Sequence, residues 1–215
     1  MIRIAIDGPG GAGKSTIAKL VASRLGMEYI DTGAMYRAIG LKLLRSGISC
    51  SDEAAVSAML EQTDVDFENG CILLDGEDVS GQIRTQEVSM MASDCSKLAC
   101  VRAKLVALQR QIAAGKSVVM DGRDIGTNVL KDAELKIFLT ADPMVRAERR
   151  YKELIAAGKE ADLETICEEI RQRDHQDMTR ELNPLRQAED AVLLDTSDLS
   201  IDEVLDAVIA MVKEL

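Results

Sequence analysis

A glycine-rich stretch near the amino terminus constrains the fold of this chain more than any other feature. It reads Gly8-Pro9-Gly10-Gly11-Ala12-Gly13-Lys14-Ser15 and fits the pattern G-x-x-x-x-G-K-[ST]. Isoleucine alternates over residues 2–6 before it, as in a β-strand. After it, apolar residues recur at helical spacing up to Leu25, and Gly26 is a predicted helix cap. A strand, a glycine-rich loop and a helix in this order predict a phosphate-binding loop.

Each part of this loop has a chemical purpose. Glycines let the backbone turn so that successive N–H groups point at phosphate oxygens. The helix that opens at Lys14 adds the positive end of its dipole. Lys14 supplies a positive charge to the β- and γ-phosphates, and the hydroxyl of Ser15 is a ligand for Mg²⁺. The loop therefore predicts nucleotide binding with Mg²⁺ as the metal cofactor.

Composition and charge exclude several classes of protein. The 215 residues carry a net charge of −11, and 47% of them are hydrophobic, which suffices for a substantial core. A chain this acidic does not attract nucleic acid or an anionic membrane through its overall field. Aromatic residues make up only 2%, which argues against a platform for stacking bases. With no visible signal peptide and no long apolar run, we expect a cytoplasmic protein without nucleic-acid or membrane partners.

The cysteines and the single histidine point to no chemistry of their own. The five cysteines are odd in number and form no C-x-x-C pair, so we expect free thiols in a reducing compartment. His175 is interpreted as a surface residue, and Met90-Met91 as part of the core.

Strands and helices alternate along most of the chain. Strands are expected near residues 2–6, 29–30, 117–121, 135–139 and 191–194. The predicted fold is therefore α/β, a P-loop NTPase-type five-stranded parallel sheet flanked by helices. Predicted helices cover residues 14–25, 34–44, 52–61, 85–96, 100–114, 143–157, the stretch from the break at 158–162 to about 180, and 201–214.

The pattern changes between residues 64 and 82. Short β-like pieces at 65–67, at 71–74 and near Val79 are separated by Asn69-Gly70 and Asp75-Gly76. These dipeptides are strong signals for hairpin turns. The stretch is predicted to form a small antiparallel insertion in the α/β chain.

Arginines placed at particular sites in so acidic a chain indicate an anionic ligand. The run from Asp31 to Arg37 follows the second predicted strand. Thr32 is expected to cap the next helix and to bond an anion, with Arg37 one turn further on the same side. A plain helix cap beside a surface arginine is the alternative.

A second candidate site follows the apolar strand that ends in Asp121. An acid at the carboxyl end of a parallel strand lies on the edge where α/β proteins bind ligands. Asp121 is expected to hold the water shell of Mg²⁺ or to orient a substrate, and Arg123 to clamp a phosphate. A β-turn with a local ion pair is the alternative.

Two further clusters lie on the predicted helices after residue 142. Arg173, Asp177 and Arg180 share one helix face, and an exposed ion-pair ladder is the other interpretation of this pattern. The second cluster consists of Arg146, Arg149 and Arg150. It is interpreted either as part of a mobile lid that supplies an arginine to the transferring phosphoryl group or as a solvated face.

The reaction class follows from what is present and what is missing. A GTPase would show a guanine-reading N-K-x-D, which the sequence lacks, and a motor would be larger. A phosphate loop with additional arginines suits transfer from ATP to an acceptor that is itself an anion.

Several motifs together resemble those of the bacterial cytidylate kinases, of the nucleoside monophosphate kinase superfamily. The resemblance covers essentially the whole chain. It implies the reaction ATP + CMP → ADP + CDP, with dCMP also accepted. The motifs that carry it are Gly8–Thr16, Asp31–Arg37, Gly76–Val88, Asp121–Thr127 and Lys136–Leu139.

The resemblance also implies roles for individual residues. Those that would hold ATP are Gly8, Pro9, Gly10, Gly11, Ala12, Gly13, Lys14, Ser15 and Thr16. Those that would surround the acceptor phosphate are Thr32, Arg37, Arg123 and Arg180. The ribose would be reached by Arg173 and Asp177, and the cytosine would be read by Ser93, Arg102 and Asp124. Those expected to take part in catalysis are Lys14, Asp121, Arg123 and Arg173.

The assignment to cytosine is chemically reasonable. A carboxylate such as Asp124 accepts from the N4 amino group, and Arg102 donates to the N3 and O2 acceptors. Uracil would place a carbonyl against the carboxylate, a mismatch of about 1–3 kcal/mol or more. We therefore expect CMP to be preferred over UMP.

We expect a single kinase domain over residues 1–215, acting as a monomer on ATP and CMP or dCMP. Its core would be residues 1–62 and 106–215, its monophosphate-binding region about 63–105 and its lid about 150–164. Two alternatives stay open at this point. One is another small P-loop kinase acting on UMP, AMP or shikimate, and the other is a nucleotide-dependent switch without an acceptor.

Overall fold

The computed structural model of the chain describes residues 1–68 and 70–215. They form two compact units. The P-loop unit comprises residues 1–29 and 115–215, and the second unit comprises residues 30–114. The stretch expected to bind the monophosphate, residues 63–105, belongs to the second unit.

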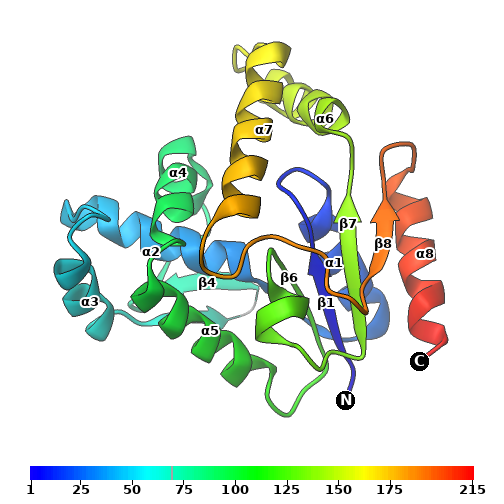
Figure 1. Cartoon of the computed structure of the whole chain (residues 1–215), viewed down its shortest axis with the longest axis horizontal. Helices are drawn as coiled ribbons and strands as arrows, with labels where there is room; N and C mark the ends of the chain where they lie inside the picture. Colours follow the sequence, from blue (N-terminus) through cyan, green and yellow to red (C-terminus); the bar gives the residue numbers. More distant parts are fainter. Residues whose placement is uncertain (69) are drawn as a thin grey trace. The chain divides into compact units, whose positions relative to one another are not determined.

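A five-stranded sheet confirms the predicted α/β class (Figure 1). Its strands lie in the order β2-β6-β1-β7-β8. The central strand β1 pairs in parallel with β6 and β7, and β7 pairs in parallel with β8. Every residue of β6 is buried, as is usual for strands covered on both faces. The bounds are β1 Arg3–Asp7, β2 Glu28–Asp31, β6 Val118–Gly122, β7 Leu135–Thr140 and β8 Val192–Asp195.

Helices α1 (Lys14–Leu25) and α8 (Ile201–Lys213) bury their apolar sides in one core with β1 and β7. Gly26 ends α1 in the left-handed conformation, as predicted. Ser200 and Glu203 form the predicted capping box at the start of α8.

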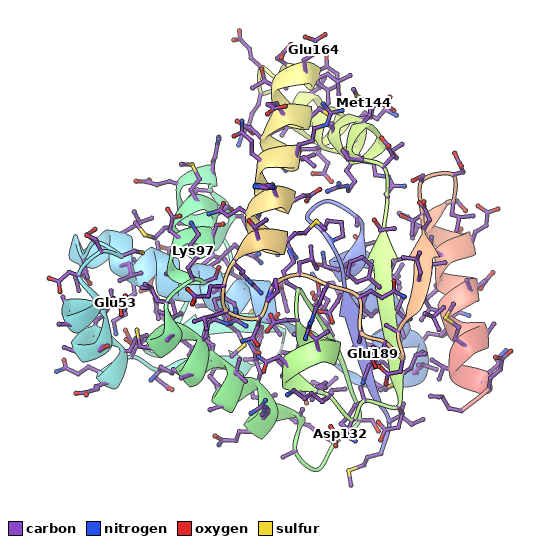
Figure 2. The ribbon with its side chains drawn as sticks, in the orientation of Figure 1. Glu53, Lys97, Asp132, Met144, Glu164 and Glu189 are labelled. Atoms are coloured by element: carbon purple, nitrogen blue, oxygen red, sulfur yellow. The ribbon has the colours of Figure 1, made fainter. Side chains whose placement is uncertain are left out.

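Helices α6 (Pro143–Ala156) and α7 (Leu163–Thr179) lie side by side beyond the carboxyl end of β7 (Figure 1). A small core that includes Ala147, Ile166 and Cys167 holds them together. Figure 2 shows Glu164 at the outer tip of this pair, whereas Asp132 lies at the opposite end of the sheet. The helix pair is therefore at the sheet edge where α/β proteins bind ligands.

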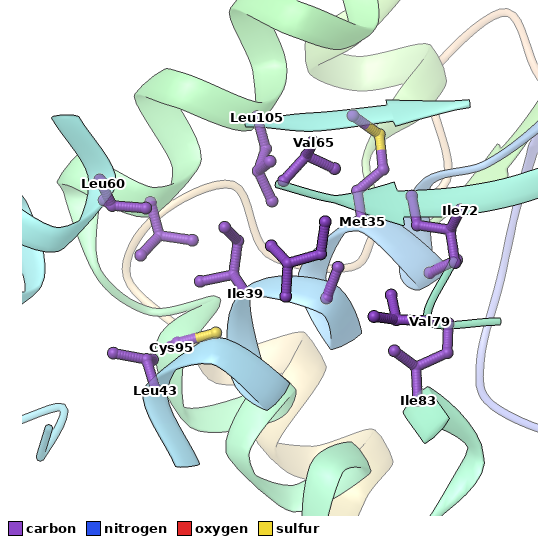
Figure 3. Packing of buried hydrophobic residues seen from close by; sticks show 14 of the residues in the cluster. Met35, Ile39, Leu43, Leu60, Val65, Ile72, Val79, Ile83, Cys95 and Leu105 are labelled. Atoms are coloured by element: carbon purple, nitrogen blue, oxygen red, sulfur yellow. The ribbon is translucent and has the colours of Figure 1, made fainter. Parts of the chain in front are cut away.

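The second unit is built around α2 (Thr32–Ser46). Buried side chains of α2, among them Ile39, pack against β4 and α5 in one apolar cluster (Figure 3). A Cβ atom on Gly40 would lie 2.9 Å from the backbone nitrogen of Ala92, so glycine is required where α2 meets α4. The other helices of this unit are α3 Glu53–Glu61, η1 Gln82–Arg84, α4 Gln86–Cys95 and α5 Ala99–Ala113.

The predicted antiparallel insertion is a three-stranded sheet of β3 (Val65–Glu68), β4 (Cys71–Leu74) and β5 (Glu77–Asp78). Asp75 and Gly76 both have positive φ, as a two-residue hairpin turn requires. Asn69 of the other predicted turn lies outside the described residues. The third strand ends one residue before its predicted place near Val79, because the buried Val79 leads into η1 instead.

One predicted loop is partly helical. Residues Ile125–Val129 form a short π-helical turn, η2, where the sequence suggested only loop from 122 to 128. The backbone N–H of Leu130 donates to the carbonyl of Ile125 at 2.7 Å. The N–H groups of Ile125 and Gly126 also donate to the carboxylate of Asp7 in β1. The spacing of apolar residues within the segment cannot predict such a long-range contact.

Three smaller predictions also have outcomes. All five cysteines are free, and His175 is exposed, as expected. Met90 is 61% exposed, so the prediction that it belongs to the core was wrong, while its neighbour Met91 packs against the core. Among the residues that the structure describes, we find no helix with the length and apolarity to cross a membrane.

Candidate active site

The glycine-rich loop joins β1 to α1 in a conformation that few other residues tolerate. Gly8, Gly11 and Gly13 all have positive φ. A Cβ atom on Gly8 would lie only 1.9 Å from the carbonyl oxygen of Leu139 in β7. The loop therefore sits close against the end of the neighbouring strand.

Lys14 is buried at the first residue of α1. Its ammonium Nζ donates to the carbonyl oxygen of Pro9 at 2.7 Å, within the loop. Burial, assisted by the nearby charge of Arg123, lowers the pKa of Lys14 to about 7. A bound polyphosphate would offset both effects, so the lysine is suited to an anionic ligand.

The buried lysine makes stability depend on pH. Its pKa is about 7 in the folded chain and near 10.5 in the unfolded chain, so the unfolded chain binds more protons between these values. The free energy of unfolding then rises with pH across this window, and the cost is fully present below pH 7. We expect the Tm of the nucleotide-free protein to rise from about pH 7 to pH 9, and Lys14→Met to lose that part of the rise. Thermal melts followed by circular dichroism test this, and identical pH dependence in both proteins would contradict it.

Asp121, at the end of β6, accepts hydrogen bonds on both carboxylate oxygens. The hydroxyl of Ser15 donates to Oδ2 at 2.8 Å, and the phenol of Tyr29 donates to Oδ1 at 2.8 Å. Asp121 therefore holds the Ser15 side chain in place at the start of α1. Tyr29 is a residue that sequence reasoning missed, because it attracts attention only once β2 and β6 are in the same sheet.

The oxygen donors at Ser15 fit a small, hard cation. The Ser15 hydroxyl and the buried Asp121 carboxylate offer oxygen ligands, which Mg²⁺ prefers. Within residues 1–68 and 70–215 no group of three His, Cys, Asp or Glu side chains assembles into a further metal site. A cation held by one protein side chain, nucleotide phosphates and water matches this donor set.

Two predicted site arginines lie against the glycine-rich loop: Arg123, expected at the acceptor phosphate, and Arg173, expected at the ribose. A Cβ atom on Gly10 would be 3.4 Å from Nη2 of Arg123 and 3.9 Å from Nη1 of Arg173. Arg123 follows β6 and Arg173 is in α7, so tertiary structure joins three segments that are distant in sequence. This arrangement concentrates positive charge beside the loop.

Arg123 is held by a carboxylate from α7. Its Nε donates to Oδ2 of Asp177 at 2.9 Å. Burial alone would lower the pKa of Arg123, but the charge of Asp177 raises it overall, so the guanidinium stays charged. Burial would also raise the pKa of Asp177, but Arg123 holds it below its usual value. The alternative of a local ion pair within a β-turn was therefore wrong for Arg123, because its partner Asp177 lies in another element.

A second pair links the next residue to the end of α7. Nη2 of Arg180 lies 3.2 Å from Oδ1 of Asp124, and both side chains are nearly buried. Asp124 also accepts from Nδ2 of Asn128 at 3.0 Å, and Arg180 donates to the carbonyl of Asn183. The alternative of an exposed ladder along α7 is wrong for Asp177 and Arg180, because each reaches the segment after β6.

Arg146 is also not part of a solvated face. It is only 2% exposed, and its guanidinium donates to the carbonyl of Gly10 at 2.9 Å and to both oxygens of Asp174. Arg149 donates to the carbonyl of Thr196, and Arg150 alone of the three is exposed and pairs locally. The lid assigned to residues 150–164 stays a prediction.

In the second unit, the amino end of α2 differs from expectation in one respect. The helix cap is Asp31, whose carboxylate accepts from the backbone of Ala34, and Thr32 is the first helical residue. The prediction that Thr32 caps the helix was wrong, because the carboxylate one residue earlier occupies that role. Asp31 also binds Nη2 of Arg37 at 3.0 Å. The guanidinium therefore lies over the amino end of α2.

Arg102 is buried in the first turn of α5, in the same unit. Its Nη1 donates to the carbonyl of Ser96 at 3.5 Å, and its guanidinium carbon is 5.9 Å from the ring centre of Tyr36. Ser93 lies on the last turn of α4, and its carbonyl accepts from the hydroxyl of Ser96. A guanidinium beside an aromatic ring presents planar groups against which a planar base can stack.

The predicted substrate residues fall into two groups. The P-loop unit brings together Lys14, Ser15, Asp121, Arg123, Asp124, Arg173, Asp177 and Arg180. The second unit contains Thr32, Arg37, Ser93 and Arg102. Two residues that the sequence analysis did not single out contact these groups: Tyr29 donates to Asp121, and the ring of Tyr36 lies beside Arg102. Two others bind neighbouring residues: Asp7 accepts from Gly126, and Asp174 accepts from Arg146.

Comparison of the sequence with known proteins identifies the family of this chain. The family model described as cytidylate kinase matches residues 4–214. This chain belongs to the cytidylate kinase family. A cytidylate kinase from Caldicellulosiruptor saccharolyticus is 55% identical over 214 residues, which cover 98% of this chain and 95% of that protein. The cytidylate kinase of Thermosipho melanesiensis is 48% identical over 212 residues, covering 99% and 97%.

Solved structures add the fold alone. An uncharacterised protein from Eubacterium ventriosum aligns with a TM-score of 0.59 at 12% identity, covering all of both chains. The shikimate kinase of Bacteroides thetaiotaomicron aligns with a TM-score of 0.52 at 14% identity, covering 99% of this chain and 98% of that one. The predicted resemblance to cytidylate kinases and the P-loop kinase fold are both confirmed.

Proposed function

We propose that this protein transfers the γ-phosphoryl group of ATP directly to CMP or dCMP, forming CDP or dCDP. The observation that carries this proposal is the cytidylate kinase family match over residues 4–214. The charge of the P-loop unit supports it, because Lys14, Arg123 and Arg173 cluster at one loop. The net charge of −11 supports nucleotides rather than nucleic acid as partners. We also propose that the enzyme acts in the cytoplasm.

ATP binds through residues 8–16 in this proposal. The backbone of the glycine-rich loop surrounds the phosphates, and Lys14 turns from Pro9 to the β- and γ-phosphates. Ser15, held by Asp121, is the protein ligand of Mg²⁺. When bound, Mg²⁺ neutralises charge on the β- and γ-phosphates.

The acceptor phosphate is bound by Arg123 and Arg180, together with Thr32 and Arg37. Arg123 commits Nε to Asp177, while its Nη2 end lies against Gly10. The carboxylate therefore orients the guanidinium toward the loop that holds the donor phosphates. Arg173 and Asp177 serve the ribose, and Ser93, Arg102 and Asp124 serve the cytosine.

The chemistry requires charge neutralisation more than proton removal. The nucleophile is an oxygen of the acceptor phosphate, which is already an anion at neutral pH. The barrier comes largely from bringing two phosphate groups together, and fixed positive charges reduce it. Lys14 acts on the donor and Arg123 on the acceptor, and Arg173 lies with Arg123 beside Gly10 of the loop.

An acceptor panel tests the proposal. Initial rates of ADP release are measured with ATP, Mg²⁺ and each of CMP, dCMP, UMP, AMP and shikimate, and without acceptor. We expect rapid turnover with CMP and dCMP. Faster turnover with UMP, AMP or shikimate would identify a different kinase. Slow hydrolysis that no acceptor changes would identify a nucleotide-dependent switch.

Asp124 is expected to decide between cytosine and uracil. Because a carboxylate facing a uracil carbonyl costs about 1–3 kcal/mol, kcat/KM for CMP should exceed that for UMP roughly 5- to 150-fold. Asp124→Ala should reduce kcat/KM for CMP far more than for UMP, so that the ratio falls toward one. Both acceptors are assayed at several concentrations in each protein.

The control for this variant is Asp198→Ala, which removes an exposed carboxylate. It should leave the ratio of CMP to UMP unchanged. Equal kcat/KM for the two acceptors in the unmodified enzyme would defeat the cytosine-reading role of Asp124.

A further inference from the structure

Asp7 is a buried carboxylate that the proposed chemistry does not use. It is the last residue of β1, directly before Gly8, and only 5% of it is exposed. Its Oδ1 accepts from the backbone N–H of Ile125 at 2.8 Å, and its Oδ2 accepts from that of Gly126 at 2.7 Å. These two groups open the η2 turn, immediately after Arg123 and Asp124.

Only a carboxylate makes both bonds. Its two oxygens accept from two successive N–H groups, and the charge is favoured at the start of a helical turn. An asparagine would offer one accepting oxygen and would turn an N–H₂ donor toward the other N–H group. Burial raises the pKa of Asp7 to about 6, which the two backbone hydrogen bonds partly oppose. The buried carboxylate therefore fixes the position of the two N–H groups that it binds, which a smaller or apolar residue would not do.

The η2 turn is fitted closely to this carboxylate. A Cβ atom on Gly126 would lie 3.1 Å from Cδ of Lys136 and 3.4 Å from Oδ2 of Asp7. A side chain at position 126 would therefore crowd the stem of Lys136 that packs against the turn. The carbonyl of Asp124 accepts from the backbone of Asn128 at 3.0 Å, so Asp124 is tied to the same turn.

We infer that Asp7 is a positioning residue for acceptor recognition, which fixes the η2 turn so that Arg123 and Asp124 meet the substrate in one geometry. This inference rests on the proposed function, in which those two residues bind CMP. Two adjacent residues at the end of β1 then have different roles. Gly8 begins the loop that binds ATP, whereas Asp7 positions the residues that bind the acceptor.

The test is Asp7→Asn, compared with Asp198→Asn as the matched control on an exposed carboxylate. We expect KM for CMP to rise at least about tenfold and the preference for CMP over UMP to fall, as for a lost charge-assisted hydrogen bond. The affinity for a non-hydrolysable ATP analogue, measured by calorimetry, should stay within about twofold. Equal losses for ATP and CMP would overturn the inference, because Asp7 would then act through the glycine-rich loop.

A second variant keeps the carboxylate and disturbs the turn instead. Gly126→Ala should also raise KM for CMP without weakening the ATP analogue. Asp198→Ala, the exposed control outside the proposed site, should change neither. This pair decides the matter if Asp7→Asn does not fold. An unchanged KM for CMP in Gly126→Ala would count against the inference.

One readout needs no substrate. Amide hydrogen exchange at Ile125 and Gly126, followed by NMR, should accelerate at least about tenfold in Asp7→Asn, because both N–H groups lose their partner or part of it. Unchanged exchange would overturn the inference even where the acceptor panel supports CMP. If the unmodified enzyme fails to phosphorylate CMP, the proposed function fails first, and the inference fails with it.

Discussion

Lys14→Met is expected to lower kcat for CMP phosphorylation on the order of 10²–10³-fold, as when a charge-stabilising donor is removed from a buried site. Lys14 Nζ donates to the carbonyl of Pro9 within the glycine-rich loop that is predicted to hold the donor phosphates. Methionine keeps the length and apolar stem of the side chain but not the charge. Steady-state rates at saturating ATP and CMP measure the effect.

The thermal stability of Lys14→Met should not fall with its activity. Burial of the ammonium disfavours the folded state at neutral pH, so removing the charge is not expected to lower the Tm of the nucleotide-free protein. Lys213→Met, on the exposed side of α8, should keep full activity. A Lys14→Met protein that is well folded and retains more than about a tenth of wild-type kcat would refute the role given to Lys14.

Arg123→Met is expected to reduce kcat/KM for CMP on the order of 10²–10³-fold, as truncation of a largely buried, hydrogen-bonded charge does. The substitution removes the guanidinium that lies beside Gly10 and leaves the Asp177 carboxylate buried without it. The loss should therefore appear both in acceptor binding and in thermal stability.

A double variant separates the two effects. Arg123→Met with Asp177→Asn removes the buried unpaired charge and should restore much of the lost Tm, but not the activity. Arg186→Met, at an exposed position outside the proposed site, is the control and should change neither quantity. If activity returned together with Tm, Arg123 would be a structural residue only.

Local pattern was sufficient where chemistry and structure lie within one segment. The glycine-rich loop, the cap at Gly26 and the Ser200 capping box are each specified by a few neighbouring residues, and all appear as predicted. The Asp75-Gly76 turn is a similar case, since positive φ at both residues is a local requirement. The alternation of predicted strands and helices along the chain also indicated the parallel sheet, because a helix between two strands returns the chain for parallel pairing.

Local pattern failed where a long-range partner decided the outcome. The η2 turn forms in a predicted loop because Asp7, more than 100 residues earlier, accepts its first two N–H groups. Arg146 was assigned to a lid or a solvated face, but Asp174 and the Gly10 carbonyl bury it. Helical spacing alone does not distinguish an exposed arginine from one that crosses to another element.

The sequence by itself therefore determined the phosphate-binding loop, the order of strands and helices, and the family to which the chain is similar. Those properties depend on residues that are close along the chain or on motifs read as text. Only the tertiary structure decided which carboxylate holds which arginine: Asp177 for Arg123, Asp124 for Arg180 and Asp174 for Arg146. The reason is physical, because a buried charge is stable only beside its partner. The fold alone brings α6, the segment after β6 and the residues of α7 and its carboxyl end within hydrogen-bonding distance.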